Sequence, residues 1–374
     1  MTPYTRRPML RILSAALLAL LLAVPAAEAA KRAVPQGWLG VTADGPLSPA
    51  DVAEWDLMTG AGVETVRVAF SWRAIQPAPG GPLDFSSSDA LVAAAVTRGM
   101  GVLPVVEFAP DWAAVRPGDL AAPPSDLAAV QAFLTAVVQR YGPAGSLWAE
   151  RPDLPRRPIR VWQVWNEPNH TGFWNATPYA PSYVATLRAA AAGIRAADAA
   201  ATVLLGGLTN TSWIALRQLY DAGAHGAFDA VALHPYTRRP KDVVRLVRLS
   251  RGVMRKHGDG GLPIWITELS WPAAKGKPVP RPIGIEVNER GQQWRLAVAL
   301  RQLARIRVRQ RIGGVFWYTW LSTEAGANPF DWAGLRRDRA GTRSSAPALG
   351  TFRHVARRLE GCAKVRGDAR RCAK

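Results

Sequence analysis

The sequence predicts a single-domain α/β protein folded as a (β/α)8 barrel. Eight short apolar runs alternate with eight longer segments of helical character, many of them rich in alanine. Near-continuous apolar runs of this length are typical of strands that are buried on both faces, as in a parallel sheet. The chain has 374 residues, 48% of them hydrophobic, which suffices for one barrel-sized core. A doubly wound open sheet is the alternative, although it usually has fewer strands and often a glycine-rich phosphate loop after the first.

Each apolar run predicts one strand, and each segment between them predicts one helix. The expected strands are 38–42, 65–70, 101–108, 159–165, 202–207, 228–234, 263–269 and 313–320. The expected helices are 49–59, 86–98, 125–140, 181–198, 212–222, 242–257, 288–310 and 346–360. Three long irregular segments follow strands in this register, so we expect them on the barrel face that carries active sites: 109–124, 271–287 and 321–344.

The first 29 residues predict a secretory signal peptide. A basic start with three arginines precedes an apolar run at 12–24, and Ala27-Glu28-Ala29 has the small residues of a cleavage site. The run is shorter than the roughly 20 residues that a membrane span needs. We therefore expect cleavage after Ala29 and a folded domain over 30–374 with a short basic C-terminal tail; a retained anchor is the alternative. The expected location is secreted or associated with the cell envelope.

The charge of the chain is strongly positive. The net charge is +19, and removal of the three arginines and one glutamate of the predicted signal leaves +17. Such a surplus favours acidic surfaces or polymers by long-range attraction. The basic residues are densest at 301–311 and 353–374, where we interpret them as solvated helix faces and a tail. For an exported monomer, an anionic envelope or an acidic polysaccharide is a better partner than nucleic acid.

The cysteines and motifs exclude several kinds of site. Cys362 and Cys372 lie ten residues apart and predict one disulfide that pins the tail. The five histidines are scattered, with no HExxH, so we expect no metal site. The sequence has no GxGxxG, no P-loop and no GxSxG motif. We therefore expect no nucleotide cofactor.

Polar and aromatic residues stand at the ends of the predicted strands, which converge on one pocket in a barrel. These residues are Arg67 within strand two and Trp72 at its end, Asp111 and Trp112 after strand three, and, at the ends of later strands, Asn166 and Glu167 (four), His234 and Tyr236 (six), Glu268 (seven) and Trp320 (eight). Two convergent carboxyl groups suit the hydrolysis of a glycosidic bond, in which one donates a proton and the other attacks or activates water. Burial raises the pKa of a carboxylic acid and a nearby arginine lowers it, so two environments can divide these roles. The tryptophans supply flat faces for sugar rings.

The motifs "VWNEPN" at 164–169, "HPY" at 234–236 and "WITELSW" at 265–271 resemble those of clan A glycoside hydrolases, the retaining (β/α)8 enzymes. The resemblance spans nearly the whole expected domain in order and spacing. Within the clan it is closest to the family 39-like group, which includes xylosidases and exopolysaccharide endoglycosidases, and to the cellulase-like family 5. Family 5 members usually carry a histidine near the end of strand three, whereas this chain has "VVEFAPDW" there.

The resemblance implies a role for each matched residue. Glu167 would be the acid/base and Glu268 the nucleophile, and Asn166 would bind the 2-hydroxyl group of the sugar. Arg67 and Tyr236 would hold Glu268 in its ionised form. The remaining matched or aromatic positions would line the pocket: His234, Trp112, and Trp320 as the floor under the reacting sugar.

We therefore expect a glycosidase that cleaves O-glycosidic bonds of a polysaccharide or oligosaccharide by a two-glutamate double displacement, with an acidic glycan among the candidate substrates. Two alternatives remain open. One is a non-catalytic barrel that binds carbohydrate or the cell envelope, suggested by the basic charge. The other is a transglycosylase, which would use the same two glutamates.

Overall fold

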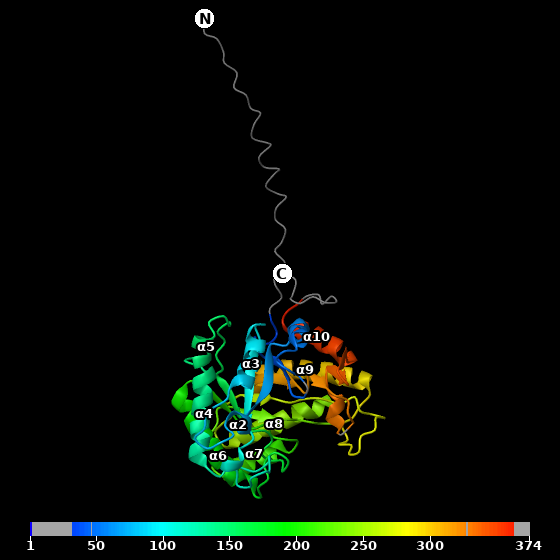
Figure 1. Ribbon diagram of the computed structural model, residues 1–374. Helices are drawn as coiled ribbons and strands as arrows, with labels where there is room; N and C mark the ends of the chain where they lie inside the picture. The colour runs from blue at the N-terminus through cyan, green and yellow to red at the C-terminus, as the bar shows by residue number, and fades with distance from the viewer. Residues whose placement is uncertain (2–31, 46, 327, 363–374) are drawn as a thin grey trace.

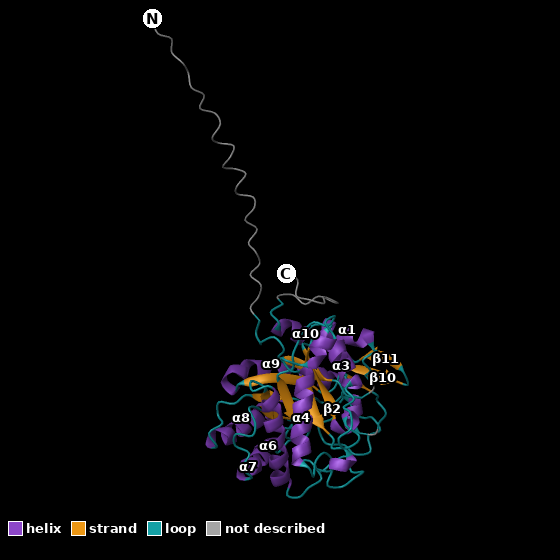
Figure 2. Ribbon diagram, turned by 60° about the vertical axis from the view of Figure 1, so that its left-hand side comes forward, coloured by secondary structure: helices purple, strands orange, loops and turns teal. Residues whose placement is uncertain are grey.

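A computed structural model of the chain describes residue 1 and residues 32–362, apart from 46 and 327. Eight parallel strands form the centre of the described part, and helices surround them (Figures 1 and 2). The strands are hydrogen-bonded in the order β5-β4-β3-β2-β1-β8-β7-β6. Parallel bridges from Leu204 to Ala230 and from Leu208 to Leu233 join the two remaining edges. The predicted (β/α)8 barrel is confirmed.

All eight predicted strands and all eight predicted helices are present. The barrel strands are β1 (Leu39–Thr42), β2 (Thr65–Ser71), β3 (Gly101–Glu107), β4 (Val161–Val164), β5 (Thr202–Leu204), β6 (Val231–Leu233), β7 (Ile264–Ile266) and β8 (Ile312–Trp317). The predicted helices correspond to α1 (Val52–Ala61), α3 (Ser86–Val96), α4 (Leu127–Tyr141), α6 (Tyr179–Ala197), α7 (Ser212–Asp221), α8 (Pro240–Lys256), α9 (Glu289–Gln310) and α10 (Pro347–Leu359).

The interior of the barrel changes from apolar to polar along the strands. A small buried cluster of Leu103, Leu204, Ala230, Ala232 and Phe316 fills the interior and is separate from the large core between strands and helices. Gly40 on β1 makes room for this cluster, because a Cβ atom there would lie 2.5 Å from the ring of Phe316. Towards the carboxyl ends, buried polar side chains take over, and these form the floor of the site described below.

The segment 321–344, expected to be irregular, contains a small sheet of its own. Strand β9 (Leu321–Ser322) pairs with β10 (Arg336–Arg339), which pairs with β11 (Thr342–Ser345). A short 3-10 helix, Pro329–Trp332, lies between β9 and β10. Two short helices were also not expected, α2 (Trp72–Ile75) and α5 (Ser146–Glu150). The small sheet and the short helices were not predicted because each element is too short to show a hydrophobic periodicity.

None of the described helices is long and apolar enough to cross a membrane. The predicted signal peptide lies outside the described residues, as does Cys372. The domain boundary at residue 29 and the disulfide between Cys362 and Cys372 therefore remain predictions.

Candidate active site

A cavity of about 800 Å³ opens at the carboxyl ends of the barrel strands. It is lined from seven barrel strands or the residues that follow them, and from two loops that the sequence places on this face. The 271–287 loop contributes Arg281 and Ile283, and the 321–344 loop contributes Asn328, Pro329 and Phe330. Of the predicted site residues, five line the cavity: Arg67, Asn166, Glu167, Tyr236 and Glu268.

The end of β4 is sharply turned, and the turn presents Asn166 and Glu167 to the cavity. Trp165 and Glu167 both have left-handed backbone angles, with φ of 69° and 38°. Residues other than glycine seldom adopt this region, and the strain is of order 1–3 kcal/mol for each. The turn is held by the backbone N–H of Trp165, which donates to Val106, and that of His170, which donates to Glu167. Strain that neighbouring elements hold in place is common where a side chain must be aimed.

Glu268 is held by two hydrogen-bond donors. Arg67 Nη1 lies 2.7 Å from Oε1 of Glu268, and the hydroxyl group of Tyr236 donates to Oε2 at 2.5 Å. Both Arg67 and Glu268 are buried, at 4% and 6% exposure. Charge-assisted bonds of this kind are shorter and stronger than neutral ones. The carboxylate of Glu268 is thus oriented through both of its oxygens.

Glu167 and Glu268 face each other across His234. His234 Nδ1 lies 2.7 Å from Oε1 of Glu167 and 3.4 Å from Oε2 of Glu268. One oxygen of each carboxyl group and the Nδ1 atom all lie within 4.8 Å of one another. A metal ion could find three ligands here, but it would have to replace the hydrogen bonds that engage the same atoms. His234 itself is fully buried behind the carboxyl groups and is not among the residues that line the cavity.

A directed chain of hydrogen bonds runs through the floor from Arg67 to Glu167. Arg67 Nε donates to Gln163 Oε1 at 2.9 Å, which leaves the amide nitrogen of Gln163 to donate to Thr267 Oγ1 at 3.4 Å. Thr267 Oγ1 lies 2.9 Å from His234 Nε2. If the threonine hydroxyl donates to Nε2, then His234 carries its proton on Nδ1 and donates it to Glu167.

Burial sets the protonation of these groups. Burial raises the pKa of Glu167 to about 7, against the opposing charges of His170 and Arg67. Burial lowers the pKa of His234 to about 3, so its imidazole is neutral at physiological pH. Both carboxyl groups are buried, but their surroundings differ, because a guanidinium and a phenol donate to Glu268 and neither donates to Glu167. Such a difference separates an acid from a base or nucleophile.

Trp320 and Trp112 do not reach the cavity. The indole of Trp320 is fully buried, and its Nε1 donates to Glu54 on α1 at 3.0 Å. Trp112 packs edge-on against Trp72, and its Nε1 donates to the backbone oxygen of Gln76 at 3.0 Å. Their positions correct the expectation that they line the pocket, which rested on counting tryptophans near strand ends. Aromatic lining comes instead from phenylalanine and tyrosine, at Phe108, Phe173, Tyr236, Tyr318 and Phe330.

Several residues of the site were not predicted. Gln163 and Thr267 form the buried chain, Tyr318 and Phe330 supply aromatic lining, and the carboxyl groups of Asp44 and Glu107 also line the cavity. For Glu107 a signal was present, because Leu103 and Val105 precede it at intervals of two in the same strand. Alternate residues of a strand share a face, so a carboxyl group at the third position points where the barrel interior opens.

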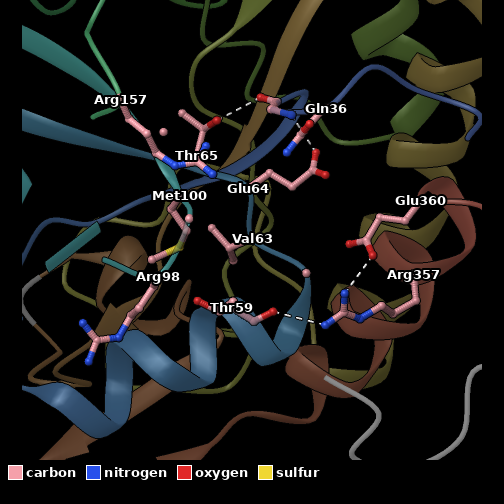
Figure 3. Close-up of a pocket in the computed structure, with 14 residues that line it drawn as sticks. Gln36, Thr59, Val63, Glu64, Thr65, Arg98, Met100, Arg157, Arg357 and Glu360 are labelled. Atoms are coloured by element: carbon pink, nitrogen blue, oxygen red, sulfur yellow. Dashed lines mark hydrogen bonds and ion pairs between the residues drawn. The ribbon is translucent and has the colours of Figure 1, made fainter. Parts of the chain in front are cut away.

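A second hollow of about 530 Å³ lies at the opposite, amino-terminal end of the strands (Figure 3). Several of its polar groups are already paired: Arg357 Nη1 lies 2.7 Å from Glu360, Thr65 donates to the oxygen of Gly37 at 3.0 Å, and Arg98 pairs with Asp56. In barrel enzymes this face serves stability, whereas catalysis takes place at the other end. We therefore assign the candidate active site to the first cavity.

The fold is shared with solved glycoside hydrolases. No protein-family model matches the sequence, and no curated protein is significantly similar to it. A family 39 glycoside hydrolase from Bacteroides cellulosilyticus WH2 is 20% identical, with a TM-score of 0.64 over 88% of this chain and 64% of that chain. A glucosidase from Croceicoccus marinus is 16% identical, with a TM-score of 0.65 over 88% and 71%.

A monomeric β-xylosidase from Caulobacter crescentus CB15 is 17% identical, with a TM-score of 0.62 over 87% of this chain and 69% of that chain. The chain spans less than two thirds of the length of the Bacteroides protein. At these identities the likeness shows the common (β/α)8 barrel fold. The Bacteroides protein belongs by its printed name to the family whose motifs this sequence resembles.

Proposed function

We propose that the protein is a retaining O-glycoside hydrolase. One observation carries the proposal: two carboxyl groups lie within 4.8 Å of each other at their nearest oxygens, one desolvated and one bound by Arg67 and Tyr236. Retaining enzymes have carboxyl groups about 5–5.5 Å apart, and inverting enzymes roughly 6.5–9.5 Å. The short separation supports direct attack by one carboxylate, because it leaves no room for a water molecule behind the sugar.

The reaction has two steps. Glu268 attacks the anomeric carbon while Glu167 gives its proton to the departing glycosidic oxygen, so a glycosyl ester forms on Glu268 as the old bond breaks. Glu167, now ionised, then takes a proton from water, and the water oxygen displaces Glu268 from the sugar. His234 donates to Glu167 in its ionised form, and Arg67 and Tyr236 receive Glu268 when it leaves.

The cavity favours an uncharged sugar. Four carboxyl groups line it, those of Asp44, Glu107, Glu167 and Glu268, whereas Arg67 is engaged by three partners in the floor. Arg281 also lines the cavity, but a sugar carboxylate would face the carboxylate of Glu268 and would oppose the ionisation of Glu167 that the first step requires. Among the structural neighbours, a glucosidase and a β-xylosidase are named for neutral sugars, whereas a β-glucuronidase is named for an acidic one. We therefore place the expected affinity for acidic polymers elsewhere on the molecule.

The outer faces of α8 and α9 are suited to binding acidic polymers. The two helices pack side by side. Their exposed cations recur at helical spacing on the outward face: Lys241, Arg245, Arg248, Arg255, Lys256, Arg290, Arg301, Arg305 and Arg309. The acids of these helices, Asp242 and Glu289, are paired with Arg239 and Arg337. We propose that this basic face holds an exported enzyme at an anionic cell envelope while the cavity cleaves a neutral glycan.

The catalytic proposal is tested with para-nitrophenyl β-glycosides of glucose, xylose and mannose. We expect cleavage of at least one, with the β-anomer as the first product in proton NMR and no turnover by Glu268→Ala. A 2-deoxy-2-fluoro glycoside of the cleaved sugar should attach to Glu268, which peptide mass spectrometry locates. An α-anomer as first product would exclude retention.

The preference for an uncharged sugar is tested with the β-glucuronide, which differs from the β-glucoside only in the C6 carboxylate. It should be cleaved at least 100-fold less efficiently than the β-glucoside. Equal cleavage of the two would refute the preference.

A further inference from the structure

Glu107 is a third buried carboxyl group in the cavity, and the double displacement does not use it. It is the last residue of β3, and the register pairs it with Ser71 at the end of β2. Leu103, Val105 and Glu107 alternate along one face of the strand; Leu103 belongs to the interior cluster, and the two others line the cavity. The side chain is only 7% exposed. Glu107 therefore rises from the barrel interior into the space that holds Glu167 and Glu268.

One oxygen of this carboxyl group has no partner. Among the described residues that line the cavity, Oε2 of Glu107 is the buried side-chain polar atom that forms no hydrogen bond. Buried polar atoms are nearly always paired, since an unpaired one loses its interactions with water without compensation. Oε1 also forms no hydrogen bond to the described residues, but it is not among the buried atoms, so Oε1 is the oxygen that a ligand in the cavity can reach.

Glu107 does not serve as a counter-ion in the floor. The positive charge of Arg67 lowers the pKa of Glu107, yet each of the three guanidinium nitrogens of Arg67 donates elsewhere: to Gln163, Glu268 and Asn166. A purely structural role would leave Glu107 bonded to such a group. The carboxyl group instead offers its accessible oxygen, Oε1, to the contents of the cavity.

The carboxyl group is protonated over most of the physiological range. Burial raises the pKa of Glu107 to about 8; Arg67 opposes this, while Glu268, Asp44 and Glu167 add to it. A protonated carboxyl group offers one O–H donor and an acceptor oxygen. A sugar hydroxyl group is both donor and acceptor, so the two match without placing a third negative charge beside the catalytic pair.

We propose that Glu107 is a substrate-binding residue whose carboxyl group hydrogen-bonds one hydroxyl group of the reacting sugar. The proposal rests on the glycosidase function proposed above, and it identifies Glu107 as a determinant of which sugar is accepted. A site built to bond a hydroxyl group discriminates strongly against an analogue that lacks it, because the buried partner is then left unpaired.

The test compares Glu107→Leu and Glu107→Gln in the full chain, assayed on the para-nitrophenyl β-glycoside that the wild type cleaves best and on its monodeoxy analogues. We expect Glu107→Leu to lower kcat/KM by about 100-fold and Glu107→Gln, which keeps a donor and an acceptor, by less than about tenfold. For one deoxy analogue the loss caused by Glu107→Leu should shrink to below about threefold, since the partner hydroxyl is already absent. Glu150→Leu and Glu150→Gln, on the exposed end of α5, are the matched controls and should leave activity unchanged.

A loss in Glu107→Leu that is the same on every deoxy analogue would overturn the proposal, because Glu107 would then act on the protein and not on the sugar. So would a kcat/KM within threefold of the wild type. If Glu107→Leu does not fold, as judged by circular dichroism, Glu107→Gln carries the same comparison with a smaller expected loss. Glu268→Ala distinguishes failure of the Glu107 assignment from failure of the proposed glycosidase function. If Glu268→Ala is inactive while Glu107→Leu is normal, only the assignment of Glu107 fails. If the wild type cleaves no glycoside, or Glu268→Ala is fully active, both fail.

Discussion

His234 Nδ1 lies 2.7 Å from Oε1 of Glu167, while its other ring nitrogen lies 2.9 Å from the hydroxyl oxygen of Thr267. The imidazole is fully buried, and its lowered pKa of about 3 keeps it neutral. A neutral imidazole has one donor and one acceptor nitrogen, so the partner on Nε2 decides whether Nδ1 can donate to Glu167. Thr267 thereby controls a hydrogen bond that it does not itself form.

Thr267→Val should lower kcat because valine has the shape of threonine but cannot donate to Nε2. General acid–base catalysis typically accelerates a reaction 10²–10⁴-fold. Loss of the tautomer in which His234 donates to Glu167 should lower kcat by roughly 10-fold. The loss should be large for glycosides with poor leaving groups and small for a dinitrophenyl glycoside, whose leaving group needs no proton. Equal losses on both substrates would contradict a role through Glu167. Thr97→Val, an exposed position on the opposite end of the barrel, is the matched control.

The raised pKa of Glu167 predicts the pH dependence of activity. A proton donor must be protonated in the free enzyme, and the pKa of Glu167 is about 7. kcat/KM should therefore decline above pH 7, by about tenfold per pH unit when the deprotonated form dominates. Glu167→Gln should remove this alkaline limb on a dinitrophenyl glycoside and leave a lower, flatter profile. A limb that persists in Glu167→Gln would assign the titration to another group.

The buried carboxyl group of Glu107 predicts a pH-dependent contribution to stability. Its pKa rises from an ordinary 4.5 in the unfolded chain to about 8 in the folded protein. The folded state thus binds the proton more tightly, so the stabilisation is fully present below about pH 4.5 and is lost as the pH rises towards 8. Glutamine does not titrate, so the stability of Glu107→Gln does not depend on the pH through this residue. The melting temperature of Glu107→Gln minus that of the wild type should therefore increase from pH 5 to pH 8.

The control for this measurement is Glu150→Gln. Glu150 is exposed, and its hydrogen bond with Arg140 lowers its pKa. It is ionised in both the folded and the unfolded chain between pH 5 and 8, so its difference from the wild type should stay constant over that range. A Glu107→Gln difference that is equally constant would mean that Glu107 is already ionised at pH 5.

The barrel could be predicted from the sequence because a parallel strand is buried on both faces and appears as an apolar run. Strand β4 is an example: "VWQV" is almost wholly buried, and Gln163 is the one polar residue in it. The convergence of Glu167 and Glu268 could also be predicted, since each glutamate interrupts such a run at its carboxyl end. Period-two alternation identifies Glu107 by the same logic, but only after the strand boundaries are known.

The tryptophans mark the limit of this kind of inference. Trp320 and Tyr318 are two residues apart after β8, yet Tyr318 lines the cavity and Trp320 is bonded to Glu54. Which of the two faces the sugar depends on Glu54, an acid 266 residues earlier that also pairs with Arg336 at 2.8 Å. Phe330 reaches the cavity from a loop with its own small sheet. Neither relationship has a local signal in the sequence.

Arg67 predicts a coupling between stability and activity. Arg67→Met would leave Glu268 buried without its cation, and removal of one partner of a buried pair typically costs about 3–5 kcal/mol. We expect that loss in the free energy of unfolding, measured with urea, together with loss of turnover. Arg151→Met is the control: its pair with Asp153 is exposed, so the free energy of unfolding should not change measurably. A normal unfolding free energy in Arg67→Met would contradict the view that Arg67 stabilises the buried carboxyl group of Glu268.

The basic face of α8 and α9 predicts salt-sensitive binding to acidic polymers. Replacing Arg245, Arg248, Arg301 and Arg305 by glutamine removes four exposed charges from two adjacent helices. Cationic side chains that contact a polyanion release its counter-ions, so binding weakens linearly in logarithm with salt concentration. The variant should leave immobilised polygalacturonate at a clearly lower salt concentration than the wild type. Its kcat/KM on a neutral glycoside should not change, because these residues lie on the outer face of the barrel and not among those that line the cavity.

The control must lose equal charge from another face, since net charge alone retains a basic protein on an acidic matrix. Exposed arginines away from α8 and α9 serve this purpose: Arg156, Arg157, Arg160 and Arg188. If only net charge matters, both glutamine variants will elute at the same salt concentration. Earlier elution of the α8–α9 variant alone would locate polymer binding on that face, leaving the cavity at the carboxyl ends of the strands free for its own substrate.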